Sequence, residues 1–176
     1  HRLLQAQFPR ALLLWAPRHP ERFAAVAAAC ARADFRVTLR RRDGLPAPQT
    51  EVFVVDTLGE LMSFYAASDV AFVGGSLQEV GGHNLLEPAA LGVPALVGPH
   101  TFNFQEITEL LIDVGAVQQI SDAASLCTKL GQLFRHPDER HRRGEAGRTR
   151  IAIERGALAR TLKMIDRCWP AGTGAA

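Results

Sequence analysis

Hydrophobic and polar positions follow two patterns along the chain, short apolar runs and longer runs with helical spacing. The short runs predict six β-strands, at residues 11–16, 36–40, 51–56, 69–74, 94–98 and 116–120. The longer amphipathic runs predict helices at residues 20–33, 57–67, 83–92 and 102–113. Residues 41–50 carry Gly and Pro and predict a loop. From Ser121 the pattern predicts helix almost to Trp169, with breaks near His136-Pro137 and Gly156.

Strands and helices alternate with short connections, which predicts an α/β fold. We expect a Rossmann-like, doubly wound parallel sheet of about six strands. Residues 1–169 are expected to form a single domain, and residues 170–176 a disordered tail. Such sheets bind ligands beyond the carboxyl ends of their strands. This rule selects four loops, which follow Ala16, Asp56, Gly74 and Gly98.

Composition narrows the class of protein without identifying a ligand. Of 176 residues, 47% are hydrophobic and 22% charged, which is typical of globular domains and excludes a disordered chain or a disulfide scaffold. The net charge of +2 is too small to indicate nucleic acid, and no nucleic-acid partner is expected. Arginine far outnumbers lysine, so a single arginine is weak evidence for a site. The three cysteines lack metal-ligand spacing, which favours a reducing compartment.

The densest group of polar residues and glycines follows the strand at residues 69–74. It reads Gly74-Gly-Ser-Leu-Gln-Glu-Val-Gly-Gly-His-Asn-Leu-Leu-Glu-Pro88. Glycines ahead of a helix let backbone N–H groups approach an anion closely. The spacing is not that of the GxGxxG dinucleotide fingerprint. The run therefore indicates another kind of phosphate loop, for a nucleotide or a phosphosugar.

Simpler interpretations exist for each residue of this run. Asn84 and Glu87 have the spacing of a capping-box variant, which needs no ligand. The glycine pairs are also typical of turns, and His83 is equally compatible with a solvated loop. Glu87, one turn into a helix behind a phosphate loop, is however well placed to accept both hydroxyls of a ribose, and we favour that role.

The other three loops carry fewer candidates. Arg18, in the run Ala16-Pro-Arg-His-Pro-Glu-Arg22, is suited to a bidentate grip on phosphate, with His19 beside it, or the run only starts a helix. The run Asp56-Thr-Leu-Gly-Glu60 has capping-box spacing. The run Gly98-Pro-His-Thr-Phe-Asn-Phe104 presents three polar residues that either line the cleft or cap the next helix, namely His100, Thr101 and Asn103.

Taken together, these runs resemble one family. The stretch from Phe72 to Phe104 resembles the signature of the Kdo transferases, the 3-deoxy-D-manno-octulosonic acid transferases of lipopolysaccharide synthesis. The runs at residues 16–22 and 56–60 resemble two further family segments in the same order, and the resemblance covers residues 11–165. The pattern of a glycine-rich loop followed by Glu is shared more widely among glycosyltransferases of the two-domain GT-B type.

The resemblance implies an inverting glycosyltransferase with two Rossmann-like domains. Such an enzyme transfers Kdo from CMP-Kdo to a lipid A precursor (lipid IVA) at the cytoplasmic face of the inner membrane, with no cofactor and no metal. The match is to the C-terminal, donor-binding half. The N-terminal domain, with the acceptor site, the membrane contact and the general base, is expected to lie outside this chain. No catalytic residue is therefore expected here, and the fragment alone is expected to be soluble and inactive.

The family also implies roles for individual residues. Arg18 would contact the CMP phosphate, with His19 nearby, and the backbone of Leu58 and Gly59 would lie near the cytosine. Glu87 would hold the ribose. The residues expected to line the phosphate and sugar are Gly75, Ser76, Gly82, His83 and Asn84.

Two alternatives stay open at this point. The chain is also compatible with the donor domain of another GT-B enzyme that uses a UDP-sugar, or with a non-catalytic nucleotide-binding domain. In addition, residues 135–160 carry eight arginines against four acidic residues. This excess indicates either a surface that contacts anionic lipid or, as we favour, solvated helices in an arginine-rich protein.

Overall fold

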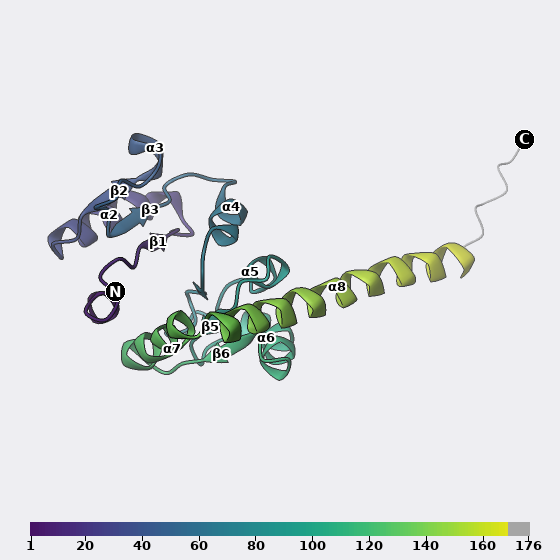
Figure 1. Ribbon diagram of the computed structural model, residues 1–176. Helices are drawn as coiled ribbons and strands as arrows, with labels where there is room; N and C mark the ends of the chain where they lie inside the picture. Colours follow the sequence, from purple (N-terminus) through teal and green to yellow (C-terminus); the bar gives the residue numbers. More distant parts are fainter. Residues whose placement is uncertain (169–176) are drawn as a thin grey trace, which may run out of the picture. The chain divides into compact units, whose positions relative to one another are not determined.

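The computed structural model describes residues 1–168, excluding the side chains at positions 155, 157–160 and 166–168. Within it the chain divides into two compact units. The first unit comprises residues 1–68 and 121–136, and the second comprises residues 69–120 and the chain from Pro137 onward. Figure 1 labels most of the helices and strands of both.

The first unit contains a parallel three-stranded sheet. Its strands are β1 (Leu13–Trp15), β2 (Val37–Leu39) and β3 (Val52–Val54), in the order β1-β3-β2. Both outer strands pair with the central strand in parallel. The helices of this unit are α1 (Arg2–Gln5), η1 (Pro20–Arg22), α2 (Phe23–Arg32), α3 (Arg40–Asp43), α4 (Leu61–Ala66) and α7 (Ala123–Arg135).

The core of the first unit lies between α2 and the central strand. Val26 and Cys30 of α2 pack with Val52 and Val54, and all four are at least nine-tenths buried. Burial raises the pKa of the Cys30 thiol, because an apolar environment disfavours the thiolate. The sheet is held mainly by this apolar contact, which stabilises roughly in proportion to the area removed from water.

The second unit contains another parallel three-stranded sheet. Its strands are β4 (Ala71–Phe72), β5 (Ala95–Val97) and β6 (Val117–Gln119), in the order β4-β5-β6. All three residues of β5 are buried, as expected for a central parallel strand. The helices are α5 (Leu86–Ala90), η2 (Phe102–Phe104), α6 (Gln105–Asp113) and α8 (Pro137–Cys168).

Helix α8 packs closely on the segment that contains α5. A side chain at Gly144 would overlap the carbonyl of Gly92, and one at Gly147 would come within 3.1 Å of the Ala116 Cβ. Two glycines three residues apart thus allow the backbones to approach. Figure 1 shows α8 continuing well beyond α5 and α6. Within residues 1–168, no helix combines the length and the apolar composition needed to cross a membrane.

The predicted elements are present with local differences. All six strands form, and all their pairings are parallel, but the hydrogen bonds join them three and three. The helix expected from residue 57 begins only at Leu61, because the Thr57 hydroxyl binds the Glu60 carboxylate instead of capping a helix. The loop expected at residues 41–50 starts with the short helix α3.

The long helical region is broken once within the described residues. The break near His136-Pro137 is confirmed, since α7 ends at Arg135 and α8 begins at Pro137. The break expected at Gly156 is wrong, because α8 passes through this position. A glycine inside a helix costs only about 1 kcal/mol relative to alanine, which a long helix tolerates. The tail predicted at residues 170–176 lies outside the described residues.

Candidate functional site

Three loops of the first unit meet at one edge of its sheet. They follow β1, β2 and β3, and because the strands are parallel their carboxyl ends share that edge. The loop after the central strand, residues 56–60, therefore lies between the other two. Neighbouring strands are about 4.8 Å apart, so side chains from all three loops are within reach of one ligand.

The loop after β1 presents an unpaired cation. Arg18 is exposed, and its guanidinium pairs with none of the side chains that the structure describes. His19 lies beside it, with its Nδ1 3.8 Å from a carboxylate oxygen of Glu21. An arginine without an internal partner remains available for an anion, as the sequence predicts for this position.

The loop after β3 is held in shape by one carboxylate. Arg40 donates to both oxygens of Glu60, with the shortest contact 2.6 Å from Nη2 to Oε1. The Thr57 hydroxyl donates to Oε2 at 2.5 Å. These donors, Arg40 first and then Thr57, lower the pKa of Glu60 to about 2. Between them Leu58 is 73% exposed and Gly59 has φ +83°, so the backbone at the tip of this loop faces outward.

Sequence reasoning missed the charged turn after β2. The backbone N–H of Arg41 donates to Oδ1 of the buried Asp56 at 2.7 Å, which joins this turn to the end of β3. Arg42 pairs with Asp43, and this pairing is the main cause that lowers the pKa of the Asp43 carboxyl. The rule that ligands bind at strand carboxyl ends would have selected this turn, since it follows β2 directly.

In the second unit the glycine loop, residues 74–82, forms a closed turn. Gly75, Gly81 and Gly82 all have positive φ, between +72° and +96°, a region in which glycine is favoured over other residues. The N–H of Gly82 donates to the Gly75 carbonyl at 2.8 Å and closes the loop. The ring of His83 lies over Gly75, because a Cβ added there would meet its Nε2 at 3.1 Å.

Ser76 has a different position from the one expected. It has no exposed surface, its hydroxyl donates to the Val73 carbonyl at 2.7 Å, and it accepts the N–H of Gly98 at 2.8 Å. The hydroxyl is thus used inside the unit and is not exposed to a ligand in this structure. The role of Ser76 changes from contact with phosphate to support of the loop.

Asn84 and Glu87 interact with each other at the start of α5. The side-chain oxygen of Asn84 accepts the N–H of Leu86 at 3.0 Å, and its amide lies 3.4 Å from a carboxylate oxygen of Glu87. Both side chains are half-buried. The capping-box interpretation is wrong, because the residue that precedes α5 is Leu85 and no side chain caps this helix. Glu87 remains partly accessible.

The loop after β5 contacts the glycine loop. The N–H of His100 donates to the Ser76 carbonyl at 2.9 Å, and that of Asn103 donates to the Gly81 carbonyl at 3.0 Å. The Asn103 side-chain amide donates to the Val80 carbonyl at 3.0 Å. No side chain caps η2 or α6, so the capping role considered for Thr101 and Asn103 is wrong.

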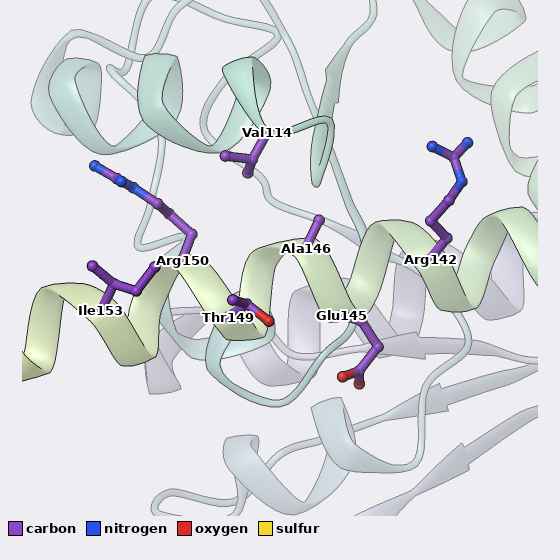
Figure 2. Close-up of a pocket in the computed structure, with 7 residues that line it drawn as sticks. All are labelled: Val114, Arg142, Glu145, Ala146, Thr149, Arg150 and Ile153. Atoms are coloured by element: carbon purple, nitrogen blue, oxygen red, sulfur yellow. The ribbon is translucent and has the colours of Figure 1, made fainter.

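Two hollows in the described part of the second unit lie elsewhere. One, of about 440 Å³, lies between α8 and the end of α6; its lining residues include Val114, Ala146 and Arg150 (Figure 2). The second, of about 410 Å³, shares Val114 and Arg150 and adds the carboxylates of Glu106, Glu109 and Asp113. Val114 comes just before β6, at the amino end of that strand. Both hollows are therefore distinct from the carboxyl-end loops, and carboxylates in one of them disfavour phosphate.

No metal site accompanies these loops in the part of the chain that the structure describes. Over that part, His, Cys, Asp and Glu side chains do not gather in groups of three or more that could hold an ion. The groups that an anion could contact are Arg18 and His19 in the first unit and, separately, the glycine-loop backbone in the second.

Two parallel three-stranded sheets with helices are the architecture of the C-terminal Rossmann-like half of a GT-B glycosyltransferase. The family model "Glycosyl transferases group 1" matches residues 46–150, and the chain belongs to this family. The matched range contains the loop after β3, the whole glycine loop and α5.

More specific similarity is to the 3-deoxy-D-manno-octulosonic acid transferases. The chain is 43% identical over 166 residues to the enzyme of that name from Haemophilus influenzae, covering 94% of this chain and 39% of the relative. It is 42% identical over 163 residues to that from Bordetella pertussis, covering 92% and 38%. The chain thus spans about two fifths of the length of these relatives.

A solved structure has the same fold. It is titled "Crystal structure of the C-terminal CMP-Kdo binding domain of WaaA from Acinetobacter baumannii". The TM-score is 0.78 at 35% sequence identity, over 84% of this chain and 79% of that chain. The fold predicted from sequence, the C-terminal Rossmann-like half of a GT-B glycosyltransferase, is confirmed.

Proposed function

We propose that this chain is the CMP-Kdo-binding domain of a Kdo transferase that acts in lipopolysaccharide synthesis. The observation that carries the proposal is the match, at 35% identity, to a domain crystallised under the description CMP-Kdo binding. The parent enzyme transfers Kdo to a lipid A precursor at the cytoplasmic face of the inner membrane, and its remaining length carries the acceptor site and the general base.

The first unit binds the nucleotide. Arg18 contacts the phosphate of CMP, since its guanidinium is exposed and without an internal partner in the described chain. His19 adds a second donor beside it. The outward backbone of Leu58 and Gly59 lies against the cytosine, and the Arg40–Glu60 pair keeps that turn in place.

The second unit binds the phosphate side of the sugar. The backbone of Gly75 and Gly82 and the side chains of His83 and Asn84 line the ligand, with Ser76 supporting them from inside. Glu87 accepts the ribose hydroxyls, because its carboxylate is half-buried and engaged only weakly by Asn84.

These residues suit the chemistry of the donor. When the sugar leaves, CMP becomes the leaving group and its phosphate gains negative charge. A guanidinium and preorganised backbone N–H groups stabilise such charge in the transition state without rearranging. The acceptor hydroxyl must lose a proton on the opposite face of the sugar, and that base belongs to the rest of the parent enzyme.

Titration of the chain with CMP and with UMP tests the proposal. We expect isothermal titration to give binding of CMP and weaker binding of UMP. Loss of charge-assisted hydrogen bonds costs about 1.5–3 kcal/mol, so Arg18→Ala should weaken CMP binding roughly tenfold to hundredfold. Arg22→Ala, a nearby exposed arginine, is the matched control and should bind CMP as the wild type does.

Glu87→Gln tests the ribose assignment separately. We expect it to weaken CMP binding and to reduce the preference for CMP over 2′,3′-dideoxy-CMP, because the carboxylate is assigned to the ribose hydroxyls. The exposed Glu106→Gln is its control. Stronger binding of UMP or UDP than of CMP would support a UDP-sugar enzyme instead. Absence of any nucleotide binding would overturn the proposal.

The chain alone should transfer no Kdo from CMP-Kdo to lipid IVA. The reason is that the base and the acceptor site are assigned to the part of the parent protein that this chain does not span. Efficient transfer by the 176-residue chain would contradict this division of roles.

A further inference from the structure

The loop after β5 holds the glycine loop in the shape that the ligand would meet. We propose that Asn103 is a positioning residue for the donor phosphate, acting through the tip of the glycine loop at Val80 and Gly81. This inference rests on the proposed function, because it concerns how the same site is shaped. It adds a residue that does not itself contact the donor.

The contacts between the two loops are of two kinds. At the base, the hydroxyl of Ser76 accepts the N–H of Gly98, and its carbonyl accepts the N–H of His100. At the tip, Asn103 donates twice, from its backbone to the Gly81 carbonyl and from its side chain to the Val80 carbonyl, each at 3.0 Å. The base is buried, whereas the side chain of Asn103 is exposed.

The tip has little room for another arrangement. A Cβ at Gly81 would overlap the Asn103 amide and the Phe102 ring, so these side chains lie directly on the loop backbone. Gly81 and Gly82 both have positive φ, which leaves their peptide groups in an orientation that other residues reach only with strain. The Gly82 N–H, turned inward to the Gly75 carbonyl, closes the loop.

Asn103 is the side chain through which this arrangement can be tested without disturbing the core. Two consecutive carbonyls, of Val80 and Gly81, accept its donors, and these bonds fix the orientation of the two peptide groups to which the carbonyls belong. The residues that follow, Gly82 and His83, are among those assigned to the ligand. If the loop holds the binding-competent shape only part of the time, the apparent Kd rises by the inverse of that fraction.

The experiment compares CMP with cytidine on the 176-residue chain. Asn103→Ala should weaken CMP binding about tenfold, as expected if the competent loop falls to about a tenth of the population. Binding of cytidine, which has no phosphate, should stay as in the wild type, so the gain in affinity that the phosphate provides should shrink. Asn103→Leu, which keeps the size of the side chain and removes its hydrogen bonding, should behave like Asn103→Ala.

Gln105→Ala is the matched control, since it removes an exposed amide two residues away that bonds only within α6, to Glu109. It should leave both ligands unaffected. Hydrogen exchange at the Gly82 N–H should become faster in Asn103→Ala and stay unchanged in Gln105→Ala. Melting temperatures of all variants are measured first, so that binding is compared well below unfolding.

The outcomes separate this inference from the proposed function. If the wild type binds no CMP, the proposed function fails and the positioning role fails with it. If the wild type binds CMP and Arg18→Ala does not, the proposed function stands. In that case an unchanged CMP affinity in both Asn103 variants, or an equal loss for CMP and cytidine, would overturn the positioning role of Asn103.

Discussion

The two units hold their strand-end loops by different means. In the first unit the loops after β2 and β3 are joined through carboxylates, by the Arg40–Glu60 ion pair and by the Arg41 N–H that donates to Asp56. In the second unit the loops after β4 and β5 are joined by a buried hydroxyl, backbone hydrogen bonds and glycines that admit no side chain. The first arrangement depends on ionisation, and the second depends on close packing. The stability of the first unit should therefore respond mainly to changes in charge, and that of the second mainly to changes in side-chain volume.

The largest effect is expected from adding one methyl group to the close contact of the second unit. A Cβ at Gly98 would overlap the backbone carbonyl of Ser76, which cannot move without breaking the loop contact. We expect Gly98→Ala to lower the free energy of unfolding by about 3 kcal/mol, the upper range for overpacking. Urea denaturation monitored by circular dichroism measures it.

Gly59→Ala is the corresponding glycine substitution in the first unit, and its stability cost is to be compared with that of Gly98→Ala. Nothing lies within 4 Å of a Cβ at this glycine, so the cost is only that of φ +83°, about 1 kcal/mol. A loss at Gly98 no larger than that at Gly59 would show that the second unit is not governed by close packing.

A smaller effect is expected from removing the hydroxyl of Ser76. In Ser76→Ala the Val73 carbonyl and the Gly98 N–H both lose their partner in a fully buried place. We expect a loss of about 2 kcal/mol in the free energy of unfolding, since unsatisfied buried groups cost about 1–3 kcal/mol. Thr57→Val, which removes a half-exposed hydroxyl in the first unit, should cost distinctly less. Equal losses would contradict the proposed contrast.

The smallest effect should appear as a dependence on pH in the first unit. The pKa of Glu60 is about 2 in the folded chain, below its ordinary value of 4.5, mainly because Arg40 donates to it. A carboxyl with a lowered folded pKa stabilises the fold fully above its unfolded pKa. This contribution is lost as the pH falls from about 4.5 to about 2.

Glu60→Gln should therefore be less stable than the wild type at neutral pH, with a difference that shrinks in acid and in high salt. Denaturation midpoints of both proteins across that pH range measure the difference, and Glu106→Gln, at an exposed position, is the control. A stability difference that does not change with pH would mean that Glu60 stabilises the fold through its packing and neutral hydrogen bonds and not through its negative charge.

The described arginines of α8, in the second unit, are mostly engaged in ion pairs. Arg140 pairs with Asp69, and Arg143, Arg148 and Arg150 each pair with a glutamate of the same helix. These partners favour the interpretation of a solvated helix over that of a surface held for anionic lipid. Exposed pairs of this kind contribute little to stability, so their number says little about the fold.

Sequence reasoning located the strand-end loops better than it assigned the side chains within them. The glycine loop and Arg18 stand where the pattern placed them, because apolar runs define parallel strands and their ends define the binding edge. Ser76 and Asn103 illustrate the limit. Ser76 follows a glycine and Asn103 stands between two phenylalanines, yet Ser76 is fully buried and Asn103 bonds a carbonyl 23 residues away. Nothing in local spacing distinguishes a hydroxyl that faces a ligand from one that faces its own backbone.

The sequence by itself determined the α/β alternation, the parallel strands, the resemblance to a glycosyltransferase family and the loops that carry candidate chemistry. These features follow from periodicity and turn residues, which act within a few positions along the chain. Only the tertiary structure decided that the strands pair three and three, that Glu60 binds Arg40 instead of capping a helix, and that the loop after β5 holds the glycine loop. The physical reason is that hydrogen bonds and close packing between distant segments depend on register and distance, which local sequence preferences do not specify.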